Sequence, residues 1–229
     1  MKKSSSLVVI LILLTVCVMI SSCQTGKSFV FSSDCVAPCW RHIQPGRTTE
    51  KEANDLVAGF SDIKGDNVWR GGLESIAQYI EFDLSSGVNV RIYLMDKVVA
   101  LIKFVDPSGI ITFGDCVQEF GVPEFAVQSS VMGYGLPIGA TSAWHTWFYA
   151  LNTDKGTAYG YDTYGYFGKN AVLAPKTRVM VIEFYDVDSF EKLLKDEFLI
   201  NVEVTKNLTT GNLNSWNGYG DIDKLYPEK

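Results

Sequence analysis

Two histidines, His42 and His145, limit the acid–base chemistry that this chain could carry out. His145 lies in a strand-like aromatic run, and with an acid such as Asp162 and a nucleophile it could act as a general base on a cell-wall or extracellular substrate. The strand pattern favours a packed or surface position for this histidine instead. The sequence contains no Gly-x-Ser-x-Gly, His-Glu-x-x-His or Gly-x-x-x-x-Gly-Lys-Ser/Thr motif. We therefore predict no catalytic residues, and we keep an envelope enzyme as an alternative.

Carboxylates that could bind a hard cation occur as two pairs, Asp186 with Asp188 and Asp221 with Asp223. Neither pair has the loop spacing of a calcium site, and solvated turn residues explain both better. A zinc site built from Cys35, Cys39 and His42 would lack its fourth ligand. The sequence therefore predicts no metal and no cofactor.

Cysteine usage indicates an oxidising compartment. Cys35 and Cys39 are separated by only three residues, so we expect them to close a small disulfide loop. Cys116 has no such neighbour and is expected to be a small buried hydrophobic residue.

Large aromatic side chains gather between residues 144 and 167, on a strand-like run and the glycine-rich segment after it. Tyrosine and tryptophan favour surfaces that are apolar on one side and wet on the other, and they dominate binding hot spots. The candidate binding surface consists of Trp144, Trp147, Tyr149, Tyr159, Tyr161 and Tyr164. It would contact a protein or a cell-wall glycan. The alternative is a sheet with both faces in the core and an overhanging loop.

Residues 20–23, with the sequence Ile-Ser-Ser-Cys, close an export signal. Two lysines precede fourteen residues that are apolar except for one threonine, a stretch too short to span about 30 Å of hydrocarbon. The four closing residues resemble the lipobox of bacterial lipoproteins. The resemblance implies cleavage before Cys23 and a diacylglycerol on its thiol, and two acyl chains anchor a protein stably. The alternatives are an ordinary cysteine after a signal sequence, or an uncleaved membrane segment over 7–22.

Charge narrows the choice of partners. Removal of residues 1–22 leaves 207 residues with 18 basic and 26 acidic side chains, a formal net charge of −8. An acidic surface repels phosphate backbones, which argues against nucleic acid as a partner. We expect attachment to a cell membrane through the lipid on Cys23, on the extracytoplasmic side, and a protein or glycan partner in the envelope. Which membrane holds the lipid stays open.

The first helix is predicted over 49–61, because Thr49 and Glu52 form a capping box before apolar residues at helical spacing. Four strand-like runs follow and read as an antiparallel meander: 68–70, 79–84, 88–94 and 98–105.

The second helix is predicted over 113–120, between the cap Thr112 and the stop signal Gly121. Strand-like runs follow at 125–132, 143–151, 157–161 and 177–185. A third helix is expected after a cap at Asp188 or Ser189, and the aromatic tail at 216–220 should fold back onto the domain. The fold class is α+β, with two helix-plus-antiparallel-meander units packed together and a third helix near the C-terminus.

Several phrases of the sequence resemble envelope lipoproteins. Residues 43–53 and 112–123 are similar to a helix-capping and Gly-x-Pro signature of small lipoproteins of the BamE type and of β-lactamase-inhibitor-like domains, although Phe60-Ser61-Asp62 stands where the first Gly-x-Pro would be. A closer resemblance is to uncharacterised bacterial lipoproteins, through the phrases at 38–40, 45–49, 113–115, 121–124 and 216–220. It implies a surface-anchored α+β domain with no established activity.

The expected organisation is a lipoprotein signal peptide (1–22), a tether (23–34), a first unit (35–108) and a second unit with the C-terminal helix and aromatic tail (109–229). We predict a membrane-anchored extracytoplasmic lipoprotein that acts as a binding or scaffold module of the cell envelope. An inhibitor protein, suggested by the inhibitor-like fold, is a further alternative to the enzyme.

Overall fold

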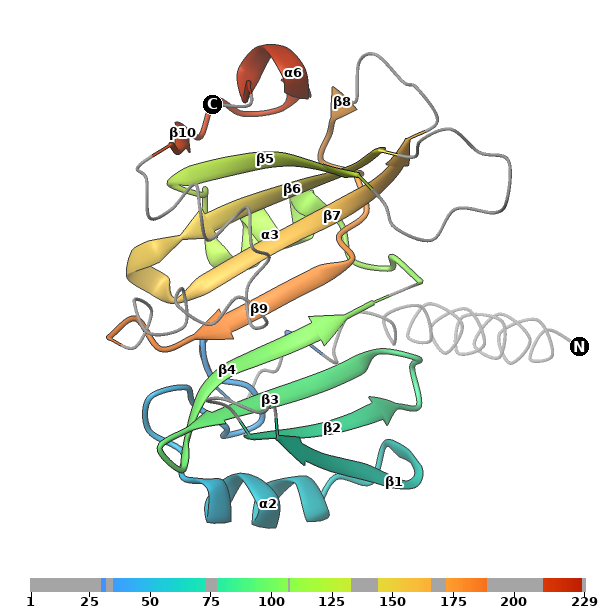
Figure 1. Ribbon diagram of the computed structural model, residues 1–229, viewed down its shortest axis with the longest axis vertical. Coiled ribbons are helices and arrows are strands. Elements are labelled where there is room, and N and C mark those ends of the chain that lie inside the picture. Colours follow the sequence, from blue (N-terminus) through green and yellow to red (C-terminus); the bar gives the residue numbers. More distant parts are fainter. Residues whose placement is uncertain are drawn as a thin grey trace, which may run out of the picture.

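Figure 1 shows a computed structural model of the chain. The structure describes residues 30–31, 35–72, 78–106, 108–132, 144–165, 172–188 and 212–227. The helices are α2 (Glu50–Ala58), α3 (Phe113–Phe120) and α6 (Ile222–Leu225), with a 3-10 turn η1 (Thr153–Lys155). The strands are β1 (Ile63–Gly72), β2 (Gln78–Leu84), β3 (Asn89–Met95), β4 (Val98–Val105), β5 (Phe125–Met132), β6 (Trp144–Asn152), β7 (Thr157–Gly165), β8 (Val172–Leu173), β9 (Val181–Tyr185), β10 (Asn214–Ser215) and β11 (Gly220–Asp221). These elements confirm the α+β class, with strands predominating.

Two runs of strands share one antiparallel sheet. In the described part of the chain its order is β1-β2-β3-β4-β9-β7-β6-β5-β10, while β8 and β11 pair separately. The first run, β1 to β4, is a continuous meander. The second run consists of β5, β6, β7 and β9, which also lie next to one another in the sheet in chain order. Because β9 pairs with β4, the last strand of each run lies at the seam between them. The two meanders are therefore joined edge to edge.

Both long helices start where the sequence predicts. Thr49 and Glu52 form a reciprocal capping box at the start of α2, and Thr112 and Asp115 do the same for α3. Helix α2 ends earlier than the predicted residue 61, because the Gly59 N–H already bonds to the carbonyls that close the last turn. Local side-chain chemistry therefore sets the helix starts.

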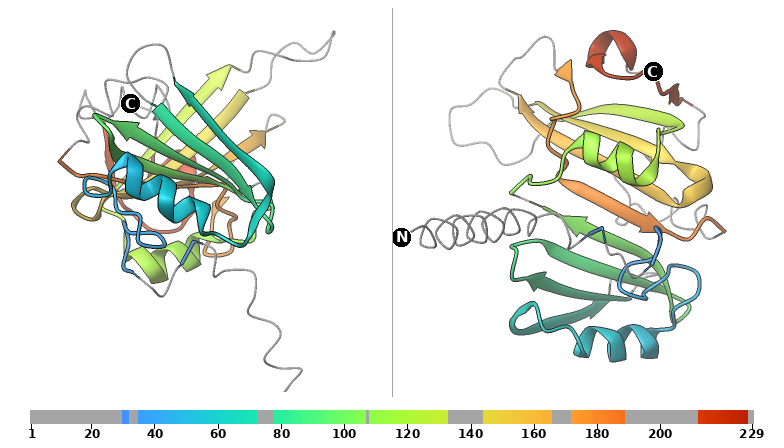
Figure 2. Two further views of the ribbon diagram at one scale, coloured as in Figure 1. Left: turned by 90° about the horizontal axis from the view of Figure 1, so that it is seen from below. Right: turned by 180° about the vertical axis from the view of Figure 1, so that it is seen from behind.

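The two helices cover the same face of the sheet, which we call the helix face. Ala53 of α2 and Phe113 and Phe120 of α3 belong to one continuous core with the inward residues of the strands. Figure 2, in the view from behind, shows α3 lying across the second half of the sheet and α2 at the end of the first half. Trp40 is fully buried in this core and meets the rings of Phe60 and Phe104 edge to face.

The opposite face, which we call the second face, has its own buried cluster. Its members lie around the seam and on β5 to β7: Tyr93, Ala100, Leu101, Val127, Tyr149, Leu151, Ala158, Val181 and Tyr185. Toward β1 the same face is open, because Trp69 is 66% exposed and Arg91 is exposed as well.

The segments near both ends of the described chain pack onto the domain. Val30 is 2% exposed, and Phe31 meets Phe120 at 5.7 Å between ring centroids. Of these two residues, which were expected in the tether, Val30 is therefore part of the core and Phe31 packs against it. At the other end, Tyr226 is buried against Phe148 with 5.0 Å between the rings.

Other predictions fall on residues that the structure does not describe. They are the signal sequence, Cys23 and the third helix after Ser189. Within the described residues no helix is long and apolar enough to cross a membrane.

Candidate functional site

Three of the six rings predicted to form an exposed aromatic surface are buried instead. Tyr149, Tyr159 and Tyr161 are 2%, 0% and 5% exposed. Tyr159 and Tyr161 lie on the helix face, where they pack edge to face against Phe113 of α3. Burial raises the pKa of both phenols. Tyr149 lies in the cluster on the second face. Where the side chains of this hairpin are described, both of its faces are thus covered, as in the alternative interpretation, and these three tyrosines cannot act as a contact surface.

The other rings belong to the same hairpin, but the structure does not describe their side chains: Trp144, Trp147 and Tyr164. The same holds for His145 and Asp162. Their backbones pair across β6 and β7, with His145 opposite Tyr164 and Trp147 opposite Asp162.

The cysteine predictions are confirmed. Cys35 and Cys39 form a disulfide. Cys116 is a buried free thiol, and burial raises its pKa well above the ordinary value. No cluster of three or more His, Cys, Asp or Glu side chains that could hold a metal ion occurs among the residues that the structure describes.

A groove of about 520 Å³ lies between α2 and the loop that precedes it. Its loop wall consists of His42, Gln44, Arg47 and Thr48, and its helix wall of Glu52, Asp55 and Leu56. Sequence reasoning missed this site, because the residues around it match no catalytic or binding motif. The one sequence feature that could have indicated it is a loop rich in polar side chains that leads directly into a capped helix.

An unusual turn presents His42 to the groove. Trp40 and Ile43 exchange both backbone hydrogen bonds, at 2.9 and 2.8 Å, so Arg41 and His42 are the central residues of a two-residue hairpin turn. Both have positive φ, +48° and +67°. Hairpin turns of this kind favour Asn-Gly or Asp-Gly, because a β-carbon is disfavoured at positive φ. Arginine and histidine at these positions need support from their surroundings.

The support comes from Arg41. Its guanidinium donates two hydrogen bonds to the Asp62 carboxylate, at 2.6 and 2.7 Å. It also lies over the rings of Trp40 and Phe60, 4.8 and 5.0 Å from their centroids. Bidentate pairing and ring stacking are both favoured by the planar guanidinium. Arg41 therefore fixes the turn from behind, and His42 is left exposed at the groove.

Backbone hydrogen bonds hold the rest of the loop against β4. Gly46 N–H donates to the Val99 carbonyl at 2.7 Å, and Val99 N–H donates to the Thr48 carbonyl at 2.8 Å. Gly46 has φ +79°, and a β-carbon there would collide with the Asp186 carboxylate at 2.4 Å. The positive φ favours glycine at this position, and any side chain there would also displace the Asp186 carboxylate.

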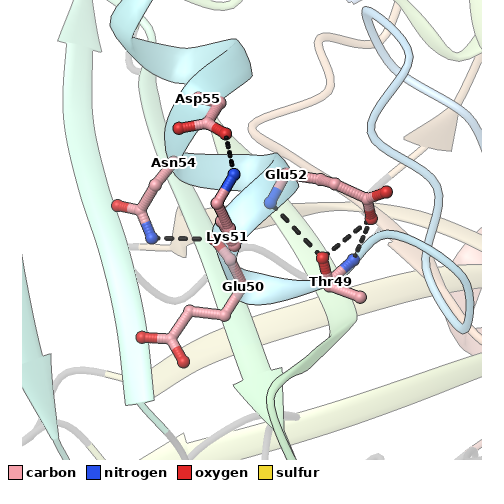
Figure 3. A network of polar contacts seen from close by, with 6 residues as sticks. All are labelled: Thr49, Glu50, Lys51, Glu52, Asn54 and Asp55. Atoms are coloured by element: carbon pink, nitrogen blue, oxygen red, sulfur yellow. Dashed lines mark hydrogen bonds and ion pairs between the residues drawn. The ribbon is translucent and has the colours of Figure 1, made fainter.

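Hydrogen bonds and an ion pair link the polar side chains of the helix wall to their neighbours, as Figure 3 shows. Glu52 Oε2 accepts hydrogen bonds from both the backbone N–H and the hydroxyl of Thr49, each at 2.8 Å. These bonds lower the pKa of Glu52, so its carboxylate is ionised at neutral pH. Asp55 pairs with Lys51 at 3.0 Å, and Asn54 bonds back to the Glu50 carbonyl at 2.8 Å.

The two walls carry opposite chemistry. His42 and Arg47 offer N–H donors on the loop side, and Glu52 and Asp55 offer carboxylates on the helix side. Leu56 adds an apolar contact. Thr48, the hydroxyl in the groove, already accepts a hydrogen bond from Gln44 N–H at 2.8 Å. This arrangement suits the binding of a small polar molecule, and its volume lies within the usual range for ligand sites.

No family model, no curated protein and no solved structure matches this chain. The likeness to envelope lipoproteins stays a prediction from the sequence phrases.

Proposed function

We propose that this protein is an extracytoplasmic lipoprotein, anchored through an acylated Cys23, that binds a zwitterionic ligand such as an amino acid or short peptide in the groove beside α2. The turn at Arg41 and His42 is the observation that carries the binding half of the proposal. Both residues of this turn have positive φ, and an ion pair and two ring contacts hold Arg41 in place, so the turn presents the imidazole of His42 at the groove.

The ligand class follows from the two walls. Arg47 and His42 would receive a carboxylate, and Glu52 and Asp55 would receive an ammonium group on the other side. A ligand with one charge only would interact with one of the two walls.

The disulfide and the packing of Val30 support the anchoring half of the proposal. The Cys35–Cys39 disulfide fits an oxidising compartment. Val30 is buried in the core, so only residues 24–29 would separate the lipidated cysteine from the folded domain. A fully extended chain of that length reaches roughly 25 Å. The domain would therefore work close to the membrane surface.

Acyl labelling tests the anchor. A palmitate analogue should label the wild-type protein, and Cys23→Ala should lose the label and move to the soluble fraction. An unmodified sulfur at residue 23 in the mass spectrum of the natural product would contradict the anchor.

Titration with free amino acids and dipeptides tests the groove. Each charged hydrogen bond is worth about 1.5–3 kcal/mol, so Arg47→Gln and Glu52→Gln should each lower affinity roughly tenfold or more. Glutamine at residue 52 keeps the capping box, so the helix start is preserved. Glu50→Gln is the matched control, because Glu50 lies in the same first turn of α2 but outside the groove lining, and it should change affinity less than twofold. Equal affinities in all three variants, or no binding of any probe, would refute the site.

A further inference from the structure

Trp69 lies in the middle of edge strand β1 and is 66% exposed. Its neighbours show which way it points. Val68 packs against the core of the helix face, and Arg70 donates a hydrogen bond to Asn54 of α2 at 2.9 Å. Because side chains alternate along a strand, Trp69 stands on the second face, away from α2 and its groove. By contrast, Trp40 on the helix face is fully buried.

A row of polar side chains continues from Trp69 across the next two strands. Trp69 is opposite Glu81, Glu81 is opposite Arg91, and Asp83 is opposite Asn89 in the adjacent row. Asn89 Nδ2 donates to Glu81 Oε1 and to Asp83 Oδ1, both at 3.0 Å. Arg91 Nη2 lies 2.9 Å from Glu81 Oε1. The four polar groups therefore hold one another in fixed positions beside the indole.

The network retains capacity for a ligand. It uses one oxygen of Glu81 and one of Asp83, and a carboxylate can accept about four hydrogen bonds in all. The side-chain amide oxygen of Asn89, Oδ1, can also accept a hydrogen bond, and the guanidinium of the half-exposed Arg91 can donate one. A hollow of about 150 Å³ lies directly beside these groups, lined by Trp69, Glu81, Phe82, Asp83 and Asn89.

We propose that Trp69 and this polar row bind a neutral saccharide chain. The C–H groups on one side of a sugar ring match the apolar face of an indole, and hydroxyl groups around its rim match an array of fixed carboxylate, amide and guanidinium groups. Charge argues against anionic ligands, because two carboxylates outnumber one guanidinium here and the whole chain carries a formal charge of −6. An apolar partner would have to strip water from the charged row, at a cost that a hydroxylated ligand avoids.

This site is independent of the groove, since it lies on the opposite face of the sheet. The two proposals can therefore fail separately. Glu52→Gln should leave saccharide binding unchanged, and Trp69→Ala should leave amino-acid and dipeptide binding unchanged.

Calorimetry on the full-length protein, kept in a detergent without a sugar head group, tests the proposal. The probes are tetramers of β-1,4-linked N-acetylglucosamine, β-1,4-linked glucose and α-1,4-linked glucose, with polyphosphate as an anionic control. At least one tetramer should bind, with similar affinity at low and high salt, and polyphosphate should not. Trp69→Ala should weaken binding about tenfold or more, as for other central aromatic anchors. Trp69→Phe, which keeps a ring, should stay within about threefold.

Asn89→Ala tests the polar row separately, because it leaves the indole in place. It should weaken binding several-fold. Val172→Ala is the control for loss of an exposed apolar side chain elsewhere, since Val172 is 61% exposed, and it should have no effect. The proposal is overturned if no tetramer binds or if Trp69→Ala binds as well as the wild type. It is also overturned if the wild type is a dimer that Trp69→Ala converts to a monomer, since the indole would then serve pairing of two copies through β1.

Discussion

Lys103 and Glu183 face each other across the seam between β4 and β9, with Nζ 2.8 Å from Oε1. Their side chains are only 20% and 2% exposed. Burial alone would lower the pKa of Lys103, but the charge of Glu183 and the neighbouring Tyr149 outweigh it, and the pKa lies above its ordinary value. The pair is thus a buried ion pair at the place where the two runs of strands join.

Removal of one partner should destabilise the fold strongly. Lys103→Met leaves the Glu183 carboxylate buried without its counter-charge, which costs about 3–5 kcal/mol of unfolding free energy. The double variant Lys103→Met with Glu183→Leu should be less destabilised than the single one. Urea unfolding measures both.

The Arg91–Glu81 pair lies on the same face and supplies a matched control. These side chains are 44% and 20% exposed, with 2.9 Å between charged atoms. A pair this accessible to water contributes about 1 kcal/mol or less, so Arg91→Met should cost far less than Lys103→Met. Equal losses at the two pairs would contradict the importance of burial.

Acid should weaken the turn beside the groove. Hydrogen bonds from the Arg41 guanidinium lower the pKa of Asp62 below its ordinary value of 3.8. The stabilisation is therefore present above pH 3.8 and is lost as the pH falls through the lower pKa of the folded state. We expect Asp62→Asn and Arg41→Gln to lose the same part of the acid dependence of the melting temperature. A wild-type acid profile in either variant would rule out this pair as its source.

The turn itself should be open to stabilisation. His42→Asn replaces histidine by a residue that tolerates positive φ better, so stability should stay equal or rise by up to about 1 kcal/mol, while ligand binding in the groove falls. Lys97→Gly is the control: Asp96 and Lys97 form a similar turn with φ +51° and +64°, and neither residue lines the groove. It should raise stability without affecting binding. A strong loss of stability in His42→Asn would show that the imidazole has a structural role.

The disulfide closes a loop with a sequence separation of four. By loop entropy alone, so short a loop should contribute about 2 kcal/mol. Replacement of Cys35 and Cys39 by serine should lower the unfolding free energy by that amount, and a reductant should do the same to the wild type. If the reductant lowers stability further in the double variant, another disulfide must be present.

Gly160 of β7 leaves room for the ring of Tyr149, which lies opposite it on β6. A β-carbon at this position would come within 2.3 Å of the Phe148 carbonyl and 3.1 Å of the Tyr149 ring. Gly160→Ala should therefore cost about 2 kcal/mol or more, in line with other overpacked sites. Gly59→Ala, at an ordinary helical φ of −88° with one atom at 3.3 Å, should change stability by about 0.5 kcal/mol or less. Thermal or urea unfolding of both variants gives the comparison.

The sequence predicts those features that depend on short-range chemistry. In each capping box, at Thr49 and at Thr112, the two partner residues are three positions apart in the sequence. Both helix starts are therefore found where predicted. The Cys35–Cys39 loop is equally local. The pairing of β4 with β9 joins residues far apart in the chain, and no nearby pattern indicates it.

Alternation of side chains could not locate the binding surfaces either. It places Tyr149 on one face and Tyr161 on the other, but it does not say which faces are covered. Both are covered in the second run of strands, and the open part of the sheet lies instead at Trp69, in a strand with little else to mark it. The groove at His42 depends on the path of a loop, which a positive φ at two non-glycine residues makes hard to foresee.

The seam also has a consequence for the growing polypeptide. Glu183 leaves the ribosome 80 residues after Lys103, so β4 waits for its second neighbour with one edge unpaired. Seven of the eight residues in β4 are apolar, and such an edge is a template for pairing with another nascent chain. Lys103, the single charged residue of β4, opposes that pairing, because a strand from another chain would have to bury its ammonium group without a counter-charge. The charge of Lys103, which Glu183 later neutralises, therefore disfavours aggregation through β4 before the sheet is complete.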